Sequence, residues 1–294
     1  MNNLARLGLG TVQWGLSYGL ANQNGMTTPA EVKEILAAAQ CNGIQVLDTA
    51  SAYGTAEAVL GANSLEGFRV VTKTPKFSTP AISDSQVSHL IDVFHQSLRK
   101  LSSKQVYGLL MHGAEDLLVP GGNKLLAAMR ALKESGAVEK IGVSVYDSEQ
   151  AVAVLNQFTP DIVQLPISVL DQRLLLDGSL ERMKNAGVEL HARSVFLQGL
   201  LLMPLGNIHK YFDPIRPLLA RWHAAVEARG MSPTQAALSF VRDIPFVDTV
   251  LIGVESLDQF RSCSADFEVA ASFDASGFDC PDPKFVNPAH WKLS

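Results

Sequence analysis

The sequence predicts an α/β fold, a single-domain (β/α)8 TIM barrel over residues 1–294. Eight short β-rich runs alternate with amphipathic helical stretches along the chain, which is typical of parallel strands joined by crossover helices. The connections are short, and no Pro- or Ser-rich linker separates one part of the chain from another. Because barrels of this kind commonly run to about 250 residues or more as one unit, this length fits a single barrel.

The predicted strands are apolar runs rich in Val, Ile and Leu. Such runs, bounded by turn or helix signals, are the sequence signature of a strand. In chain order they occupy residues 4–11, 44–50, 68–74, 106–112, 139–145, 161–167, 188–195 and 248–254.

Four of the intervening helices are predicted to begin at a capping side chain. Thr28 and Ser232 are each followed by proline at the first helical position and then by an acid or an amide. Asp147 and Ser256 are each followed by glutamine three residues later. An oxygen at such a position accepts a hydrogen bond from the free N–H groups of the first helical turn.

Glycines mark the ends of helices, and one segment is irregular. The helical stretches before three strands end at Gly43, Gly136 and Gly187, where glycine suits a left-handed stop. Residues 196–231 begin with FLQGLLLMPLG and continue into a long amphipathic stretch. We therefore expect the seventh unit of the barrel to carry an extra helix.

Composition and charge restrict the partners. The net charge is −5 and Lys and Arg form no cluster, so no nucleic acid or anionic membrane is expected to bind. No apolar segment approaches the roughly 20 residues that span a bilayer, and MNNLARLGLG lacks the features of a signal peptide. The three cysteines form no C-x-x-C pair, so neither a disulfide framework nor a metal site is predicted. We expect a cytoplasmic protein that binds a small molecule.

Four ionisable side chains lie near the ends of three consecutive predicted strands. Asp48 is in the last part of the second strand, Tyr53 follows on its loop, Lys73 is near the end of the third strand, and His112 ends the fourth. Singly, each has a structural explanation: a capping acid, a packed tyrosine, a solvated lysine and a hydrogen-bonded histidine. Because barrel enzymes carry their active sites at the carboxyl ends of the strands, we expect the four side chains to converge.

Convergence of these side chains would make Tyr53 a proton donor. A free phenol has a pKa of about 10, and a neighbouring ammonium is expected to lower that pKa by stabilising the phenolate. Lys73 is the candidate cation, and Asp48 keeps it charged and in place. His112 would orient a carbonyl oxygen while a nicotinamide delivers a hydride, so the group predicts carbonyl reduction.

The same residues lie in motifs that resemble the aldo-keto reductase superfamily, nearly from end to end of the chain. The motifs are LGLGT (7–11), LDTASAYG (47–54), TKT (72–74), LLMH (109–112), IGVSVY (141–146), VQLP (163–166) and LIGVESLDQ (251–259). The resemblance implies a (β/α)8 barrel that reduces aldehydes or ketones with NADPH. It also implies a catalytic tetrad, here Asp48, Tyr53, Lys73 and His112.

The resemblance further implies where the cofactor binds. Ser144 and Gln164 would hold the nicotinamide carboxamide, and the helix that begins at Ser256 would receive the 2′-phosphate of NADPH. Ser194 and the backbone near Leu197 would contact the pyrophosphate. The implied cofactor contacts are Gly10, Thr11, Asp48, Ser144, Gln164, Arg193, Ser194, Leu197, Gly253, Glu255 and Gln259.

Several positions differ from the pattern of the family. Val145 and Cys263 each replace an asparagine that many relatives carry, and Arg193 replaces an aromatic ring that stacks on the nicotinamide. The planar guanidinium of Arg193 suits the same stacking. Glu255 lies where relatives often carry Lys or Arg for the 2′-phosphate. The resemblance implies NADPH, and NADH is the alternative that Glu255 favours by repulsion unless Arg261 compensates.

Aromatic side chains in loops are the candidates for a substrate pocket. They are Trp14, Tyr18, Phe77 and Trp291. The stretches GLGTVQWGLSYGLAN and RSVFLQGLLLM resemble bacterial members of the family that are associated with sugar or surface-polysaccharide metabolism. That resemblance implies a sugar-type carbonyl substrate.

Other functions are considered beside carbonyl reduction. GLGTVQWG lacks the third glycine of a dinucleotide fingerprint and continues into a loop, so a Rossmann dehydrogenase is not predicted. A lysine at a barrel mouth, here Lys73, also suits an aldolase that forms a Schiff base. A third alternative is a cofactor-binding regulatory subunit with the same fold, like the potassium-channel beta subunits.

Overall fold

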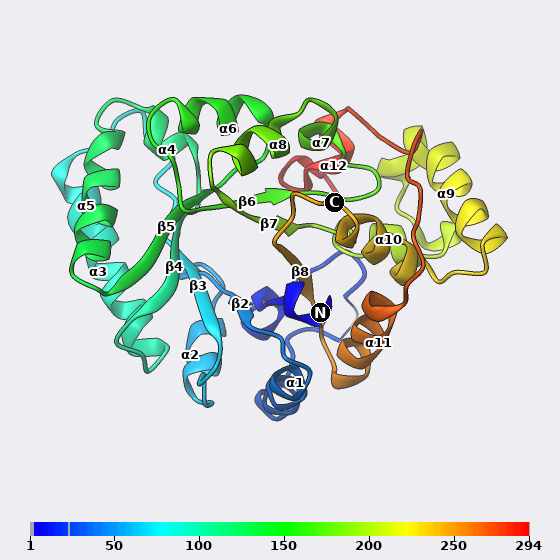
Figure 1. The fold of residues 1–294 in the computed structure, drawn as a ribbon, viewed down its shortest axis with the longest axis horizontal. Helices are drawn as coiled ribbons and strands as arrows, with labels where there is room; N and C mark the ends of the chain where they lie inside the picture. The colour runs from blue at the N-terminus through cyan, green and yellow to red at the C-terminus, as the bar shows by residue number, and fades with distance from the viewer. Residues whose placement is uncertain (1–2, 23, 294) are drawn as a thin grey trace.

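The computed structural model describes residues 3–22 and 24–293, and its strands form a closed parallel barrel in the order β1 to β8 (Figure 1). The predicted (β/α)8 fold is confirmed, and β8 pairs with β1 to close the barrel. The strands are β1 (Leu7–Gly10), β2 (Val46–Asp48), β3 (Arg69–Lys73), β4 (Val106–Met111), β5 (Val138–Ser144), β6 (Ile162–Pro166), β7 (Glu189–Arg193) and β8 (Thr249–Gly253).

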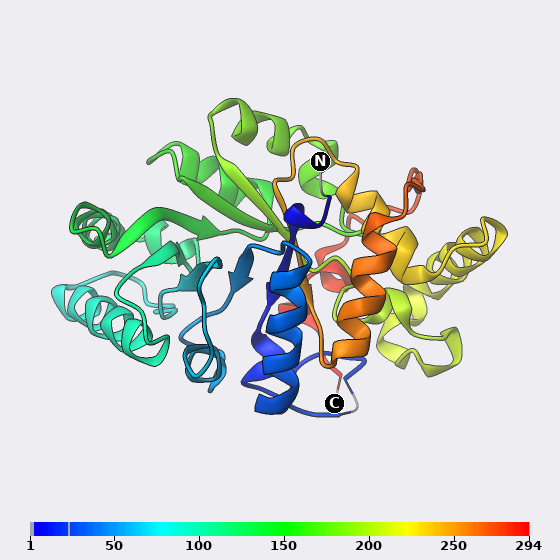
Figure 2. The ribbon, with the colours of Figure 1, turned by 60° about the horizontal axis from the view of Figure 1, so that its bottom comes forward.

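Helices follow the strands and surround the barrel (Figures 1 and 2). The α-helices are α1 (Pro29–Cys41), α2 (Ala56–Gly61), α3 (Asp84–Lys100), α4 (Glu115–Leu118), α5 (Gly122–Glu134), α6 (Ser148–Leu155), α7 (Arg173–Leu176), α8 (Ser179–Asn185), α9 (Arg216–Ala228), α10 (Pro233–Arg242), α11 (Leu257–Glu268) and α12 (Pro283–Val286). The 3-10 helices are η1 (Asn3–Arg6), η2 (Val12–Trp14), η3 (Leu200–Leu202), η4 (Leu205–Asn207), η5 (Lys210–Ile215) and η6 (Pro288–His290).

Apart from β5, which has the predicted length and begins one residue earlier, the strands are shorter than the sequence predicts. β1 begins at Leu7 because the residues before it form η1, and β2 ends at Asp48. Just beyond the carboxyl ends the ladder continues for one hydrogen bond, as from Thr49 N–H to the Val71 carbonyl at 2.8 Å, before the chain turns into a loop. Short strands leave the polar residues at their ends free to line a site rather than to extend the sheet.

The predicted helix boundaries are confirmed. Each of the four capping side chains accepts a hydrogen bond from the backbone N–H three residues later, at 2.8–3.2 Å; these are Thr28, Asp147, Ser232 and Ser256. The backbone φ is positive at the three predicted stops, Gly43, Gly136 and Gly187. A positive φ is costly for other residues, which explains glycine at these positions.

The irregular segment after β7 contains the extra helix that the sequence predicts. Three 3-10 turns, η3 to η5, lead into α9, which lies at the right-hand edge of the molecule in Figures 1 and 2. Trp222 on α9 is fully buried and donates a hydrogen bond to the Leu201 carbonyl at 3.0 Å. Its ring also meets Phe273 with the centroids 5.0 Å apart, so α9 packs firmly against the barrel unit.

Glycines in the strands allow large side chains to fill the barrel interior. The interior cluster consists of Val46, Val71, Leu110, Ile162 and Leu251. A Cβ atom on Gly8 would lie 2.8 Å from Leu251 Cδ2, and one on Gly108 would lie 3.1 Å from Ile162 Cδ1. The missing side chains therefore make room for their neighbours, and the barrel is a packed core with no pore.

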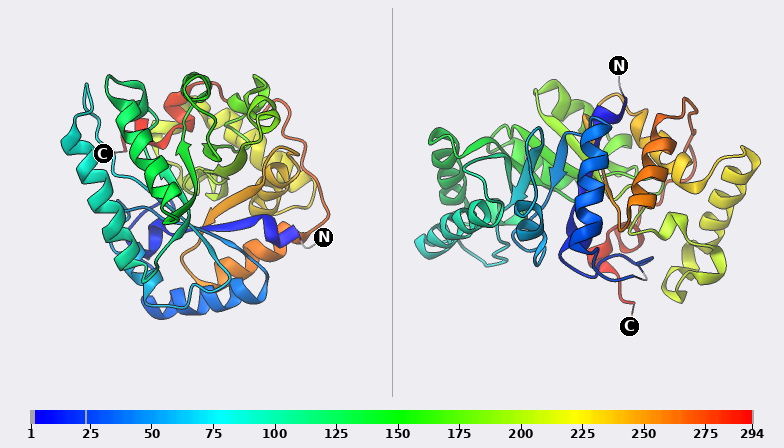
Figure 3. Two further views of the ribbon diagram at one scale, coloured as in Figure 1. Left: turned by 60° about the vertical axis from the view of Figure 1, so that its left-hand side comes forward. Right: turned by 90° about the horizontal axis from the view of Figure 1, so that it is seen from below.

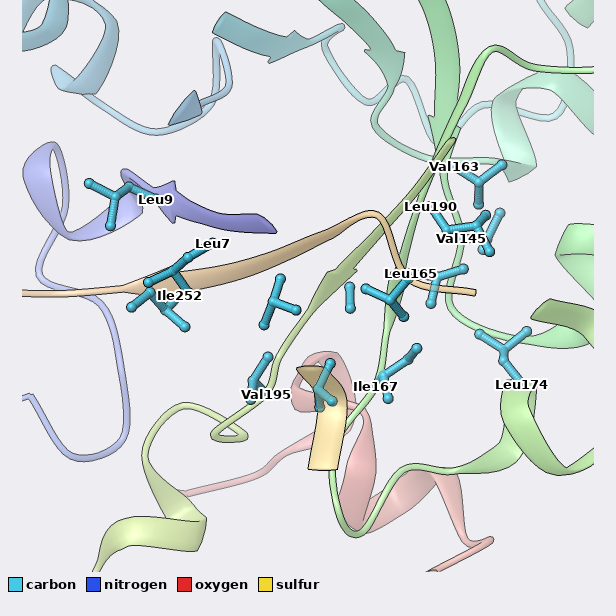
Figure 4. Close-up of a cluster of buried hydrophobic side chains, with 14 of the residues drawn as sticks. Leu7, Leu9, Val145, Val163, Leu165, Ile167, Leu174, Leu190, Val195 and Ile252 are labelled. Atoms are coloured by element: carbon cyan, nitrogen blue, oxygen red, sulfur yellow. The ribbon is translucent and has the colours of Figure 1, made fainter. Parts of the chain in front are cut away.

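A larger apolar core lies between the strands and the surrounding helices (Figure 4). Leu7 and Leu9 on β1 lie beside Ile252 on β8, and Leu174 on α7 lies at the other side of the cluster, on the side of Leu165 and Ile167 (Figure 4). All four side chains are at most 2% exposed. In the described part of the chain no helix is both long and apolar enough to cross a membrane.

A charged network lies at the amino-terminal ends of the strands, where β7 begins with Glu189. Glu189 accepts hydrogen bonds from Tyr107 at 2.7 Å and from Lys140 at 2.6 Å, and lies 2.8 Å from His191 Nε2. Burial by itself raises the pKa of Glu189, but the hydrogen bonds from His191, Lys140 and Tyr107 outweigh it and lower that pKa to about 2. The network therefore stabilises the fold through an ionised Glu189.

We expect Glu189→Gln to lower the free energy of unfolding by about 2 kcal/mol at neutral pH. The folded pKa of Glu189 lies below its ordinary value, so this stability is complete above pH 4.5 and is lost as the pH falls toward 2. Urea unfolding of parent and variant at neutral pH and near pH 2 measures it. The exposed Glu139→Gln is the matched control, and an equal loss there would contradict the prediction.

Candidate active site

A cavity of about 520 Å³ lies at the carboxyl ends of the strands. It extends from the ends of β2 and β3 to the loop between β8 and α11, and most of the residues predicted from the sequence line it. Those residues are Gly10, Thr11, Tyr18, Asp48, Tyr53, Lys73, His112, Ser144, Gln164, Arg193, Ser194, Gly253, Glu255 and Gln259. The structure thus brings the predicted tetrad and the predicted cofactor contacts to one site.

Lys73 and Asp48 form a buried ion pair at the floor of this cavity. Lys73 Nζ lies 2.7 Å from both carboxylate oxygens of Asp48 and donates a third hydrogen bond to the Thr49 carbonyl at 2.9 Å. The two residues are only 2% and 5% exposed. Burial alone lowers the pKa of Lys73, but the Asp48 carboxylate outweighs burial and the pKa is raised. Lys73 therefore stays protonated at neutral pH.

Tyr53 lies beside this ion pair. The Lys73 ammonium is 5.0 Å from the centroid of the Tyr53 ring. The sequence predicts that Lys73 lowers the pKa of Tyr53; the ammonium does act in that direction, but the net pKa of Tyr53 is raised. Burial raises the pKa of Tyr53 by more than the ammonium lowers it, and the Asp48 carboxylate adds to the rise. Tyr53 therefore holds its proton throughout the neutral range.

His112 meets Tyr53 edge to face. The two ring centroids are 6.1 Å apart with an interplanar angle of 85°. Burial lowers the pKa of His112, and the charges of Lys73, Lys76 and Arg193 lower it further, to about 2. Its Nδ1 atom is buried and has no hydrogen-bond partner among the described residues. His112 is thus a neutral imidazole beside the hydroxyl-bearing ring.

Polar residues at the ends of β5 and β6 extend the floor across the barrel. Ser144 and Gln164 are paired in register between these strands, and both are buried. Gln164 Nε2 donates a hydrogen bond to Asp48 Oδ1 at 2.6 Å, although Gln164 and Asp48 are 116 residues apart in sequence. This contact orients the carboxylate that holds Lys73, so Gln164 supports the ion pair in addition to its predicted role toward a cofactor.

Arg193, at the end of β7, stacks on an aromatic ring that the sequence prediction missed. Its guanidinium lies 4.3 Å from the centroid of the Tyr146 ring, and it donates hydrogen bonds to the Val145 carbonyl at 3.1 Å and to Ser194 Oγ at 3.2 Å. Tyr146 lines the cavity. Its position two residues after Ser144, just beyond a strand end, is the signal that could have found it.

The loop after β7 adopts strained backbone conformations. Ser194, Leu197 and Gln198 have positive φ angles of 63°, 48° and 54°, and Gly199 follows at 90°. Such angles in residues other than glycine are uncommon and cluster at functional sites. Ser194 lines the cavity, whereas the Leu197 side chain is fully buried in the core. A contact of Leu197 with a ligand would therefore have to be made by its backbone.

The loop between β1 and α1 lies against this β7 loop. Tyr18 Oη accepts a hydrogen bond from Gln198 Nε2 at 2.9 Å, and Ala21 N–H donates to the Gln198 carbonyl at 3.2 Å. Gln13, another cavity residue that the sequence prediction missed, has a buried Oε1 atom without a partner among the described residues. The cavity thus contains an unused hydrogen-bond acceptor close to its wall at Gly253.

The β8–α11 loop forms the other end of the cavity and contains one acid, Glu255. Glu255 and Gln259 line the cavity there. α1 and α11 lie side by side (Figure 2 and the right-hand view of Figure 3), and Glu31 Oε1 accepts a hydrogen bond from Leu257 N–H at 2.5 Å. Arg261 is exposed, does not line the cavity and lies 3.8 Å from Asp258.

Three of the predicted substrate-pocket aromatics lie outside the cavity lining. Trp14 is 1% exposed, and its Nε1 donates a hydrogen bond to the Val254 carbonyl at 3.2 Å. Trp291 packs on Phe212 with ring centroids 5.0 Å apart. Phe77 meets His89 at 6.1 Å. These three rings stabilise the barrel and its tail, and Tyr18 is the one of the four that borders the cavity.

Similar proteins were found by sequence and by structure. The protein "Oxidoreductase YdhF" of Escherichia coli is 29% identical over 176 residues, which are 59% of this chain and 56% of YdhF. The chain therefore matches a little over half the length of that relative. A "6-dehydroglucose reductase" of Agrobacterium fabrum is 24% identical over 256 residues, which are 81% of this chain and 82% of that protein.

The structural comparison shows the same fold. An aldo-keto reductase structure from Bacillus halodurans superposes with a TM-score of 0.72 at 19% identity, covering 92% of this chain and 88% of the other. The family model described as "Aldo/keto reductase family" matches residues 6–275, which include every strand of the barrel. The chain therefore belongs to the aldo/keto reductase family.

Proposed function

We propose that this protein reduces an aldehyde or a ketone to an alcohol with a nicotinamide cofactor. The observation that carries the proposal is the buried Asp48–Lys73 ion pair beside Tyr53 and His112, at the floor of the cavity at the carboxyl ends of the strands. A charged pair in such a place is costly to bury, and strongly perturbed groups in a cleft point to a functional site. Membership of the family supports the same conclusion.

The residues of the chain supply a proton and orient the carbonyl group. When bound, a nicotinamide cofactor supplies the hydride. Tyr53 keeps its proton at neutral pH and donates it to the carbonyl oxygen as that oxygen gains electron density. The Lys73 ammonium stabilises the phenolate that remains, and Asp48 holds the ammonium in place. His112, neutral at this pH, positions the carbonyl oxygen.

The cavity fits an elongated cofactor. It extends from Tyr53 to Glu255. Gln13 also lines it, and the buried Oε1 atom of Gln13 has no hydrogen-bond partner among the described residues. Ser144 and Gln164 present polar groups at one end, and the strained backbone at Ser194 borders the cavity between the two ends. We propose that these residues hold the nicotinamide and the pyrophosphate.

The raised pKa of Lys73 argues against the aldolase alternative. A Schiff base forms from an unprotonated amine, and here Asp48 keeps the amine protonated.

We propose a sugar-type carbonyl as the substrate, because the cavity is lined by many polar groups and because one relative is named a 6-dehydroglucose reductase.

Steady-state turnover tests the proposed function. A panel of aldoses, keto-sugars and simple aromatic aldehydes is offered with NADH and NADPH, and oxidation of the nicotinamide is followed by its absorbance. Continuous turnover of one carbonyl supports the reductase. Trapping of the protein by borohydride with a carbonyl, without turnover, would support the aldolase instead. Tight cofactor binding without any turnover would support the regulatory subunit.

We propose that the cofactor is NADH in preference to NADPH. Glu31 occupies the first amide group of α11, and Glu255 lines the cavity beside it. A 2′-phosphate at this helix end would therefore find one amide donor already taken by Glu31 and the Glu255 carboxylate in the cavity lining, whereas Arg261 does not reach that lining. A carboxylate repels a phosphate at short range, so the N-terminus of α11 should bind the 2′-phosphate of NADPH only weakly.

We expect NADH to bind at least about tenfold more tightly than NADPH, a difference of about 1.4 kcal/mol. Fluorescence titration of the two cofactors measures both dissociation constants without turnover. Glu255→Gln is expected to strengthen NADPH binding and to leave NADH binding nearly unchanged, while the exposed Glu34→Gln on α1 serves as the control. Equal affinities for the two cofactors in the parent protein would refute the preference.

A further inference from the structure

Two cations flank the Tyr146 ring at the wall of the cavity. The Arg193 guanidinium lies 4.3 Å from the ring centroid, and the Lys76 ammonium lies 5.5 Å from it. Tyr146 and Arg193 both line the cavity, and Lys76 is exposed on the loop after β3. We call these three residues the Lys76–Tyr146–Arg193 cluster. An aromatic ring attracts cations to its faces, which keeps both charges close to the cavity.

Neither cation of the cluster forms an ion pair within the described residues. The neighbouring cations do: Lys73 is paired with Asp48, and Arg173 lies 2.7 Å from Asp171. The hydrogen bonds of Arg193 go to a carbonyl and to a hydroxyl, neither of which neutralises its charge. The cluster therefore carries positive charge that no carboxylate of the described residues pairs with, from Arg193 in the cavity lining and from the exposed Lys76 outside that lining.

The cluster lies close to the reacting groups. Tyr146 and Arg193 line the same cavity as Tyr53 and His112. The charges of Lys76 and Arg193 also lower the pKa of His112. Arg193 also acts on Tyr53. A carbonyl compound whose oxygen meets Tyr53 and His112 would lie in the same cavity as Tyr146 and Arg193, so an anionic group on it would be attracted by the positive charge of the cluster.

We infer that the substrate carries an anionic group, a carboxylate or a phosphate, and that Lys76 binds it at the rim of the cavity. This inference rests on the proposed carbonyl reduction. Arg193 is restrained by Tyr146 and by its two hydrogen bonds, so it contributes mainly a fixed positive potential. Lys76 is exposed and its ammonium forms no hydrogen bond among the described residues, and an ammonium binds carboxylate and phosphate alike. Lys76 is therefore assigned as the specificity-determining residue.

Matched pairs of carbonyl compounds test the inference. Glucuronate is compared with glucose for the carboxylate, and glyceraldehyde 3-phosphate with glyceraldehyde for the phosphate. We expect kcat/KM for the anionic member of at least one pair to exceed that of the neutral member by about tenfold or more, which one charge-assisted contact provides. The pair with the larger ratio identifies the anion. The ratio is expected to fall toward one at about 1 M salt, where charges are screened.

Variants at position 76 assign the effect to one residue. Lys76→Met keeps the apolar stem of the side chain and is expected to lower the anionic-to-neutral ratio about tenfold, mainly through KM. Lys76→Glu should lower the ratio further. Lys33→Met, at an exposed lysine on α1, is the matched control and should keep the parental ratio. An unchanged ratio in Lys76→Met would refute the assignment.

Failure of the inference is distinguishable from failure of the proposed function. Turnover of neutral and anionic members at equal efficiency would overturn the anionic substrate and leave carbonyl reduction standing. If no carbonyl compound is turned over, the proposed function fails, and calorimetry still decides the binding question. In that experiment the cofactor-bound protein is titrated with gluconate against neutral glucitol and with glycerol 3-phosphate against neutral glycerol, and equal affinities within both pairs would overturn the inference.

Discussion

Replacement of Tyr53 by phenylalanine is expected to lower kcat for carbonyl reduction by at least about a hundredfold, the usual contribution of a positioned proton donor. The change removes one hydroxyl and little volume, so the cavity and the Asp48–Lys73 pair stay intact. Cofactor binding, measured by fluorescence titration, should remain near that of the parent protein. A loss confined to kcat would show that the hydroxyl acts in the chemical step.

The parent protein should show little pH dependence in the reduction rate across the neutral range. Burial raises the pKa of Tyr53 above its ordinary value of 10.0, so the proton that it donates stays in place at neutral and mildly alkaline pH. The pKa of His112, about 2, keeps the imidazole neutral over the same range. The reduction rate should therefore decline only when the solution becomes alkaline enough to ionise Tyr53.

Tyr211→Phe is the matched control for Tyr53→Phe. The Tyr211 hydroxyl donates a hydrogen bond to the Lys284 carbonyl, and Tyr211 does not line the cavity. Its kcat should equal that of the parent protein. Activity of Tyr53→Phe within a few-fold of the parent would mean that another group donates the proton, and the proposed role of Tyr53 would have to be withdrawn.

Replacement of Lys73 by methionine is expected to have the largest combined effect. It leaves the Asp48 carboxylate buried without its cation, which costs about 3–5 kcal/mol of the free energy of unfolding. It also removes the charge that stabilises the Tyr53 phenolate, so turnover should fall by at least about a hundredfold. Urea unfolding and steady-state kinetics measure the two effects separately.

The double variant Lys73→Met with Asp48→Asn separates stability from catalysis. With both charges removed, the buried carboxylate is gone, and the free energy of unfolding should recover most of its loss. Turnover should not recover, because the ammonium is still missing. If the free energy of unfolding of Lys73→Met lies within about 1 kcal/mol of that of the parent protein, the ion pair is not the stabilising contact that its burial indicates.

The fold and the convergence of Asp48, Tyr53, Lys73 and His112 could be predicted because their signals are local. Capping residues such as Thr28 and Ser256 satisfy the first turn of a helix wherever that helix packs, and Gly43 takes a positive φ for reasons within its own backbone. Asp48 and Lys73 can be recognised as strand ends because each lies at the end of an apolar run. The topology of the barrel then brings the strand ends to one face.

Other features could not be predicted, because they depend on which groups meet in space. Trp14 and Tyr18 are four residues apart in one loop, yet the first is buried against the Val254 carbonyl and the second borders the cavity. Nothing in the loop sequence distinguishes the two rings. The contact between Glu31 and α11 likewise joins residues 226 positions apart.

The amino-acid sequence alone was enough for the eight-stranded barrel, the helix boundaries and the convergence of Asp48, Tyr53, Lys73 and His112, since each follows from short-range patterns and from the geometry of parallel strands. Only the tertiary structure decided how these groups are charged. The pKa of Tyr53 is raised because burial outweighs the attraction of a nearby ammonium, and that balance depends on how all the surrounding segments pack.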